Sequence, residues 1–145
     1  MDGGFAKWTK EGRQCHGDAG VKGEDFNYKL NEDKLKTLEN IKAFADNEAQ
    51  RNFQLLDVRG PDQFNAGNIP GSTSFPVGKI LNMDTKELKS AQDRKAAFEA
   101  AGVDLSKPIS LSCQGGVAAT VVFASLQDIS TAPLSVYDGS WSQYS

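Results

Sequence analysis

Apolar and polar positions alternate along the chain with two periods, and this predicts strands and helices in alternation from about residue 34 onward. Short apolar runs predict strands, whereas apolar residues spaced three and four apart predict helices. The predicted strands are 53–58, 72–75, 108–112 and 134–137. The predicted helices are 34–47, 91–101 and 117–127. Segment 61–65 fits a short helix or turn, and a short helical turn is favoured for the ambiguous segment 77–81. Such alternation indicates an α/β domain with a parallel sheet covered on both faces.

Capping residues set the expected ends of two of these helices. Asp33 is expected to cap the 34–47 helix. Ser90 is expected to cap the 91–101 helix with Asp93 in the capping-box position, and Gly102 is expected to end it.

The segment 109–127 carries the strongest chemical signal. A predicted strand ends at Cys113, the glycines Gly115 and Gly116 follow, and a predicted helix begins at Val117. Free cysteine is usually a small buried hydrophobe. Here the glycine pair allows a tight loop, and amides at a helix N-terminus stabilise a thiolate, so Cys113 is the candidate nucleophile. The helix is apolar nearly all round, and we expect it to be deeply buried.

Composition excludes several other functions. The net charge is −3 and no basic cluster occurs, so we expect no nucleic-acid partner. No apolar run approaches the length of a membrane span, and we expect no membrane partner. Two cysteines are too few for a disulfide framework, which favours a reducing, intracellular compartment. The single histidine, His16, lies beside Cys15 in a Gly-rich stretch, so we expect a linker there and no metal site.

Four segments in order resemble the motifs of rhodanese-like sulfurtransferases. They are Leu55–Arg59, Phe64–Ser72 with Asn68 in place of the usual His, the loop after Cys113, and Tyr137–Trp141. The resemblance runs from about Lys34 to Trp141 and is closest to the C-terminal catalytic domain of two-domain mercaptopyruvate and thiosulfate sulfurtransferases. It implies a rhodanese-like fold with a parallel five-stranded sheet and helices on both faces.

The resemblance also implies an activity that needs no cofactor. A Cys113 persulfide would carry sulfane sulfur from 3-mercaptopyruvate or thiosulfate to a thiol or cyanide acceptor, with thioredoxin a candidate acceptor, in the cytoplasm or mitochondria. Structural support is expected from Asp57, Arg59 and Trp141, because a buried Arg–carboxylate pair is usually structural. The residues expected to bind substrate are Gln114, Gly115, Gly116, Val117, Ala118 and Ala119 of the loop, together with Gln63.

The sequence departs from the family at the positions that choose the donor. Gln114 and Gly115 are neutral and match neither the basic residues of thiosulfate enzymes nor the Gly-Ser of mercaptopyruvate enzymes. Gln63 stands where the family binds substrate with Arg. A cysteine phosphatase is a poor alternative, because Ala119 stands where its phosphate-binding Arg would be. A non-catalytic rhodanese-like binding module, or a persulfide carrier, stays open.

The start of the chain echoes its end. Asp2-Gly3-Gly4 with Trp8 resembles Asp138-Gly139-Ser140-Trp141, which suggests a tandem duplication. We therefore expect residues 1–30 to be the remnant of an upstream rhodanese-like domain plus a linker that packs poorly, and residues 31–145 to be the catalytic domain. The Gly-rich connector between Gly12 and Gly23 and the stop soon after Trp141 suggest truncation at both ends.

Overall fold

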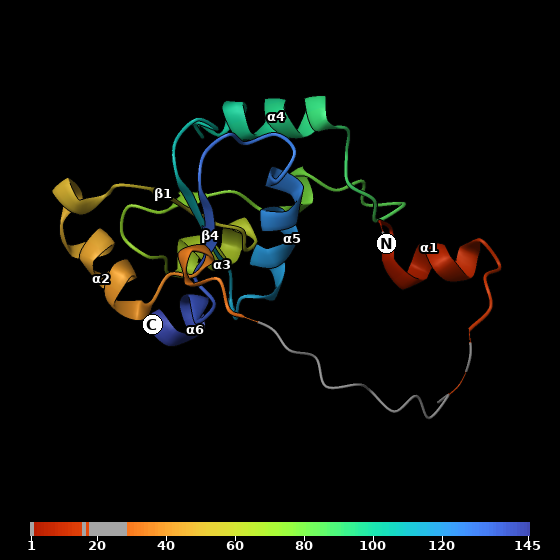
Figure 1. Ribbon diagram of the computed structural model, residues 1–145, viewed down its shortest axis with the longest axis horizontal. Helices are drawn as coiled ribbons and strands as arrows, with labels where there is room; N and C mark the ends of the chain where they lie inside the picture. The colour runs from red at the N-terminus through yellow and green to blue at the C-terminus, as the bar shows by residue number, and fades with distance from the viewer. Residues whose placement is uncertain (1, 16, 18–28) are drawn as a thin grey trace.

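A parallel four-stranded sheet forms the centre of the computed structural model, which describes residues 2–15, 17 and 29–145 (Figure 1). The strand order is β2-β1-β3-β4. The strands are β1 (Gln54–Asp57), β2 (Thr73–Ser74), β3 (Ile109–Ser112) and β4 (Leu134–Val136). Because all pairings are parallel, the C-terminal ends of β1 and β3 meet at one edge, where Asp57 lies opposite Ser112.

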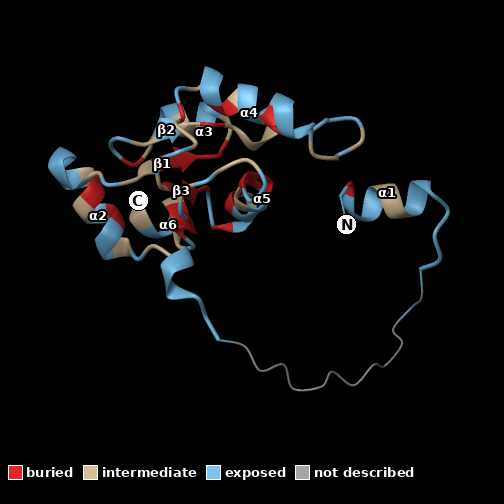
Figure 2. Ribbon diagram, turned by 45° about the horizontal axis from the view of Figure 1, so that its top comes forward, coloured by how far each residue is buried: buried red, intermediate tan, exposed pale blue. Residues whose placement is uncertain are grey.

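Helices cover both faces of this sheet (Figures 1 and 2). On one face α4 (Ala91–Ala100) and α5 (Val117–Leu126) pack on side chains of the central strands. On the other face lie α2 (Leu38–Asp46) and α6 (Ser140–Tyr144). The remaining elements are α1 (Gly4–Lys10), α3 (Pro61–Ala66) and the 3₁₀ turns Glu32–Lys34, Glu48–Gln50 and Val77–Lys79.

The two-residue period of the strands divides the core into two apolar clusters. Leu56, Leu111 and Val136 face α4 and α5, whose Phe98 and Val122 are fully buried. Leu55 and Tyr137 face α2 and α6. This double coverage confirms the predicted α/β architecture. The sheet has four strands in the described residues and not the five that the resemblance implied, because at the outer edge of β4 the chain forms only a single parallel bridge, between Leu35 and Val136.

The predicted start of the first helix was wrong. The helix α2 begins at Leu38, because Thr37 and Asn40 form a capping box: Thr37 Oγ1 accepts from the Asn40 amide at 3.3 Å, and Asn40 Oδ1 accepts from the Thr37 amide at 3.0 Å. Asp33 lies instead in a 3₁₀ turn, and the extended Leu35 reaches the sheet edge. For α4 the predicted Ser90 cap and the stop at Gly102, with φ +75°, are confirmed.

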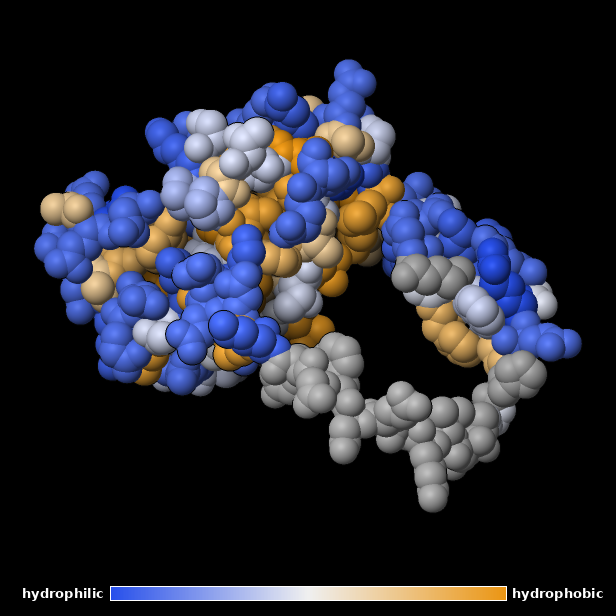
Figure 3. All heavy atoms as spheres, viewed as in Figure 1, coloured by the Kyte–Doolittle hydropathy of each residue, from blue (hydrophilic) through white to orange (hydrophobic). Residues whose placement is uncertain are grey.

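The expectation of a deeply buried α5 was also wrong. Ala119 and Val122 on its inner face are fully buried, but Val117 is 79 % exposed and Val121 is 40 % exposed. The physical reason is that α5 lies in the outer layer, so the sheet and its neighbours cover only one of its faces. In Figure 3, hydrophobic side chains are visible on the flank of the domain nearest α1.

The first residues form a helix that the sequence did not predict. No side chain of α1 is buried. Lys7 of this helix forms an ion pair with Glu87, and Asp2, just before the helix, accepts at Oδ1 from the Leu88 amide at 2.9 Å. His16 and residues 18–28 of the predicted connector lie outside the described residues. Within the described ranges, no helix has both the length and the apolar character needed to cross a bilayer.

Candidate active site

Cys113 lies directly after the C-terminal end of the central strand β3. Its side chain is part of the apolar cluster under α5 and is only 4 % exposed. The neighbouring strand is held level with it, because the Val58 amide donates to the Ser112 carbonyl at 2.9 Å. A buried cysteine at a strand end has one fixed position relative to the loop that follows, as the predicted role of a nucleophile requires.

The loop Gln114–Gly116 turns the chain from β3 into α5. Gly116 caps the helix with φ +84°, a left-handed conformation that favours glycine. A Cβ at this position would also lie 2.8 Å from both the carbonyl oxygen and Oδ1 of Asp138. The chain therefore needs glycine at 116 for two reasons, whereas Gly115 faces open space.

Most amides of the predicted anion-binding loop have no acceptor within the described structure. The free N–H groups are those of Gln114, Gly115, Val117, Ala118 and Ala119. The Gly116 amide differs, because it donates to Ser140 Oγ at 3.1 Å. The loop thus offers a cluster of unpaired donors at the positive end of the α5 dipole, which suits an anionic sulfur.

The helix α6 holds this loop through consecutive residues. Ser140 Oγ accepts from the Cys113 amide at 3.0 Å, and the Trp141 amide donates to the Cys113 carbonyl at 3.0 Å. The Ser142 amide donates to the Gln114 carbonyl at 2.9 Å, and Ser142 Oγ accepts from Gln114 Nε2 at 3.0 Å. Trp141 was predicted to give structural support, whereas Ser140 and Ser142 were not predicted as functional residues. The only available signal was that both lie in or beside the Tyr137–Trp141 segment.

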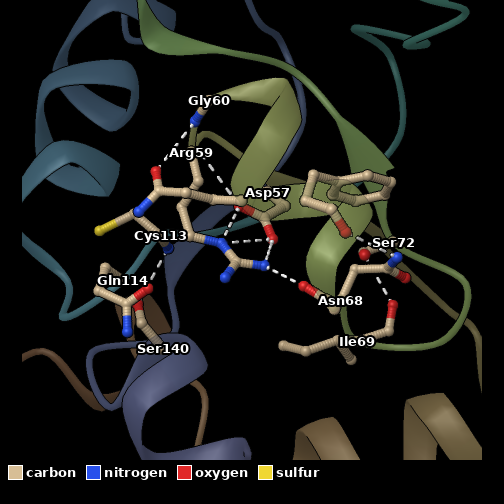
Figure 4. Close-up of polar contacts among 12 residues, drawn as sticks. Asp57, Arg59, Gly60, Asn68, Ile69, Ser72, Cys113, Gln114 and Ser140 are labelled. Carbon is tan, nitrogen blue, oxygen red and sulfur yellow. Dashed lines mark hydrogen bonds and ion pairs between the residues drawn. The ribbon is translucent and has the colours of Figure 1, made fainter.

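Asp57 and Arg59 form a buried ion pair beside the loop (Figure 4). Arg59 Nη2 lies 2.7 Å from Asp57 Oδ2 and also donates to the Gly67 carbonyl at 2.7 Å. Both side chains are 3 % exposed, and the Cys113 sulfur points away from the pair in Figure 4. The guanidinium lies over the Trp141 ring, so these contacts support a bracing role.

Gln63 is exposed on α3, one turn after the ion pair. Its Oε1 accepts from the Gly60 amide at 3.4 Å, so its side chain caps the N-terminus of α3. Asn68, which replaces the usual His of the family motif, donates from Nδ2 to the Phe64 carbonyl at 3.1 Å. Both side chains thus bond to the backbone around α3.

Residues 39–145 match the rhodanese-like domain family. Over 99 % of its length, the chain is 31 % identical to the thiosulfate sulfurtransferase of Gallus gallus and to the 3-mercaptopyruvate sulfurtransferase of Mus musculus. It spans about half of each relative, 52 % and 51 %.

Solved structures agree with the sequence comparison. The crystal structure of SseA from Escherichia coli, described as a 3-mercaptopyruvate sulfotransferase with a rhodanese fold, superposes with a TM-score of 0.82 at 28 % identity. That match covers 97 % of this chain and 55 % of SseA. The human single-domain sulfurtransferase TSTD1 shares the fold, with a TM-score of 0.55 at 20 % identity over 77 % of this chain and 94 % of its own. The parallel sheet, the cysteine loop at its C-terminal edge and these matches together place the chain in the rhodanese-like family.

Proposed function

We propose that this protein is a sulfurtransferase that carries sulfane sulfur as a persulfide on Cys113. The observation that carries the proposal is the position of Cys113 between the end of β3 and the unpaired amides at the start of α5. Family membership supports the same chemistry, and so does the 31 % identity to about half of the length of thiosulfate and mercaptopyruvate sulfurtransferases.

The reaction is a double displacement on sulfur. The Cys113 thiolate attacks the outer sulfur of the donor, an S–S bond forms, and the donor's bond to that sulfur breaks. With thiosulfate the electron pair leaves on sulfite; with 3-mercaptopyruvate it leaves on the pyruvate enolate, which takes up a proton. A thiolate or cyanide then attacks the outer sulfur of the persulfide, and the S–S electron pair returns to Cys113.

The loop amides stabilise the negative charge on sulfur in both half-reactions. Unpaired N–H groups at a helix N-terminus do this without a metal or a competing base. The amides available for this task are those of Gln114, Gly115, Val117, Ala118 and Ala119. Asp57 and Arg59 hold the surrounding backbone and do not react, because each satisfies the other's charge away from the sulfur.

The side chains predicted to bind the anionic donor are neutral or already paired. Gln114 is tied to Ser142, Gln63 caps α3, and the Arg59 guanidinium is taken up by Asp57 and Gly67. We infer that an anionic donor, either 3-mercaptopyruvate or thiosulfate, is held mainly by backbone amides. Small thiols and thioredoxin in a reducing compartment are the acceptors that fit this chemistry.

The protein is further proposed to act with an upstream rhodanese-like domain. The chain spans about half of its curated relatives. The echo between its two ends extends to the backbone: Gly4 has φ +56°, Ser140 has φ +51°, and each residue begins a helix. This correspondence supports a duplication and the assignment of residues 1–30 to a preceding domain and linker.

Intact-protein mass spectrometry tests the function directly. After mixing with each donor, the wild type and Cys15→Ser should gain one sulfur atom, and Cys113→Ser should gain none. Added thiol or cyanide should remove the sulfur. A sulfur adduct that persists in Cys113→Ser, or no adduct with either donor, would contradict the proposal.

A non-catalytic persulfide carrier is the second candidate. The neutral residues Gln63, Gln114 and Gly115 favour it, because they do not select an anion by charge. In that case Cys113 would accept sulfur from a low-molecular-weight persulfide but from neither anionic donor. The same mass measurement, with such a persulfide added, separates the two functions.

A further inference from the structure

The Ser140 hydroxyl joins the end of the sheet to the cysteine loop. It donates to the Tyr137 carbonyl at 2.8 Å and accepts from the amides of Cys113 and Gly116 at 3.0 and 3.1 Å. Ser140 is fully buried. One hydroxyl can donate one hydrogen bond and accept two, so its full capacity is used on these backbone groups.

Ser140 adopts a backbone conformation that costs free energy. Its φ is +51°, and a residue other than glycine rarely occupies this region. The corresponding position in the N-terminal echo is Gly4, with φ +56° and no atom within 4 Å of a Cβ placed there. Glycine is thus compatible with this turn. The strained serine occurs only in the C-terminal segment, which contacts the cysteine loop.

The hydroxyl also decides which loop amides stay free. It uses the amides of Cys113 and Gly116, the first and last residues of the turn between β3 and α5. With both ends of the turn fixed, the amides of Gln114 and Gly115 between them keep no acceptor in the described structure. Without the hydroxyl, a buried amide at either end would have no acceptor, and the turn would reorient to pair it with another group.

We propose that Ser140 is a positioning residue for sulfur transfer, whose hydroxyl fixes the cysteine loop so that its free amides remain directed to the sulfur. The proposal rests on the sulfurtransferase function above, but its physical test does not. Loss of the hydroxyl should weaken the stabilisation of both the Cys113 thiolate and the persulfide.

The test compares Ser140→Ala and Ser140→Gly with the matched control Ser125→Ala. Ser125 is as buried as Ser140 and donates one bond to a backbone carbonyl, but it lies near the other end of α5. Both Ser140 variants lose the hydroxyl, and only Ser140→Gly also relieves the strained φ. We expect kcat/KM for sulfur transfer to fall about tenfold or more in both, and to stay within about twofold in the control.

A second readout separates positioning from stability. The rate of Cys113 alkylation by iodoacetamide at mildly acidic pH, relative to alkaline pH, should fall in folded Ser140 variants and not in Ser125→Ala. If this ratio changes while no variant or wild type transfers sulfur, the sulfurtransferase function fails and the role of Ser140 stands. Folded Ser140 variants with an unchanged alkylation ratio and unchanged turnover would overturn the proposal.

Amide hydrogen exchange in the wild type covers the case in which both variants fail to fold. The Cys113 and Gly116 amides should exchange much more slowly than those of Gln114 and Gly115. Equal exchange rates across these four amides would overturn the proposal without any variant.

Discussion

The Arg59 guanidinium lies 4.7 Å from the centroid of the Trp141 ring and is also paired with Asp57. The stacking connects the end of β1 to α6 across 82 positions of sequence, from 59 to 141. Since the backbone amide of Trp141 donates to the Cys113 carbonyl, the same residue connects the ion pair to the cysteine loop. Three segments that are far apart in sequence, the end of β1, the cysteine loop and α6, therefore hold one another at the edge of the sheet.

Gly67→Ala should disturb this arrangement through a steric clash. A Cβ at residue 67 would lie 2.8 Å from Cζ2 of Trp141, closer than carbon atoms pack. We expect a loss of about 1–3 kcal/mol in unfolding free energy and a changed tryptophan fluorescence. Gly78→Ala is the control, because its Cβ would meet only Met83 Sδ at 3.8 Å. Equal stability of the two variants in chemical denaturation would show that Trp141 moves aside freely.

Gln63→Arg should raise kcat/KM with thiosulfate or 3-mercaptopyruvate. The substitution adds a positive charge where the family binds its anionic donor, and a charge-assisted hydrogen bond there would give about a tenfold gain. Gln63→Glu has nearly the size of the wild-type residue and opposite charge, so it should lower the rate. Steady-state kinetics with both donors measures the effect. No change in either variant would mean that residue 63 does not face the bound donor.

Asp128→Asn should destabilise the protein at neutral pH but not in acid. Arg94 is buried, and its Nη2 lies 2.8 Å from Asp128 Oδ2. The hydrogen bond from Arg94 lowers the pKa of Asp128 below its ordinary value of 3.8. Its stabilisation is therefore present above pH 3.8 and is lost as the pH falls through the lowered pKa. Solvent screens the half-exposed carboxylate, so the expected loss is at most about 1 kcal/mol.

Urea denaturation at neutral and strongly acidic pH checks this prediction. The gap in unfolding free energy between the wild type and Asp128→Asn should close on acidification. Asp46→Asn, at the exposed end of α2, is the control for removing one carboxylate. A gap for Asp128→Asn that is independent of pH would rule out the charged form of Asp128 as its cause.

Tyr137→Phe should leave the protein as stable as the wild type, or more stable by about 1 kcal/mol. Tyr137 is fully buried, its hydroxyl has no hydrogen-bond partner among the described residues, and burial raises the pKa of Tyr137. Removing a buried, unpaired hydroxyl removes a desolvation penalty without creating a cavity. Thermal or chemical denaturation measures the change. A clear loss of stability would indicate that the hydroxyl binds a partner such as an internal water.

The sequence by itself determined the features that depend on neighbouring residues. The strand, glycine loop and helix around Cys113 were predicted almost to their ends, and so were the Ser90 cap and the stop at Gly102. Periodicity, caps and turns are local signals, so they can be read without knowledge of the fold. The order of the family motifs identified the fold for the same reason, since each motif is a short continuous segment.

The tertiary structure decided everything that joins distant residues. Ser140 lies 27 positions from Cys113, and only the pairing of β3 with β4 brings its hydroxyl to the cysteine amide. The exposed face of α5 also depends on its layer, because apolar composition does not say which face the sheet will cover. Likewise Thr37 displaced Asp33 as the cap of α2 because Leu35 pairs with Val136 at the sheet edge, a contact that hydrophobic periodicity cannot encode.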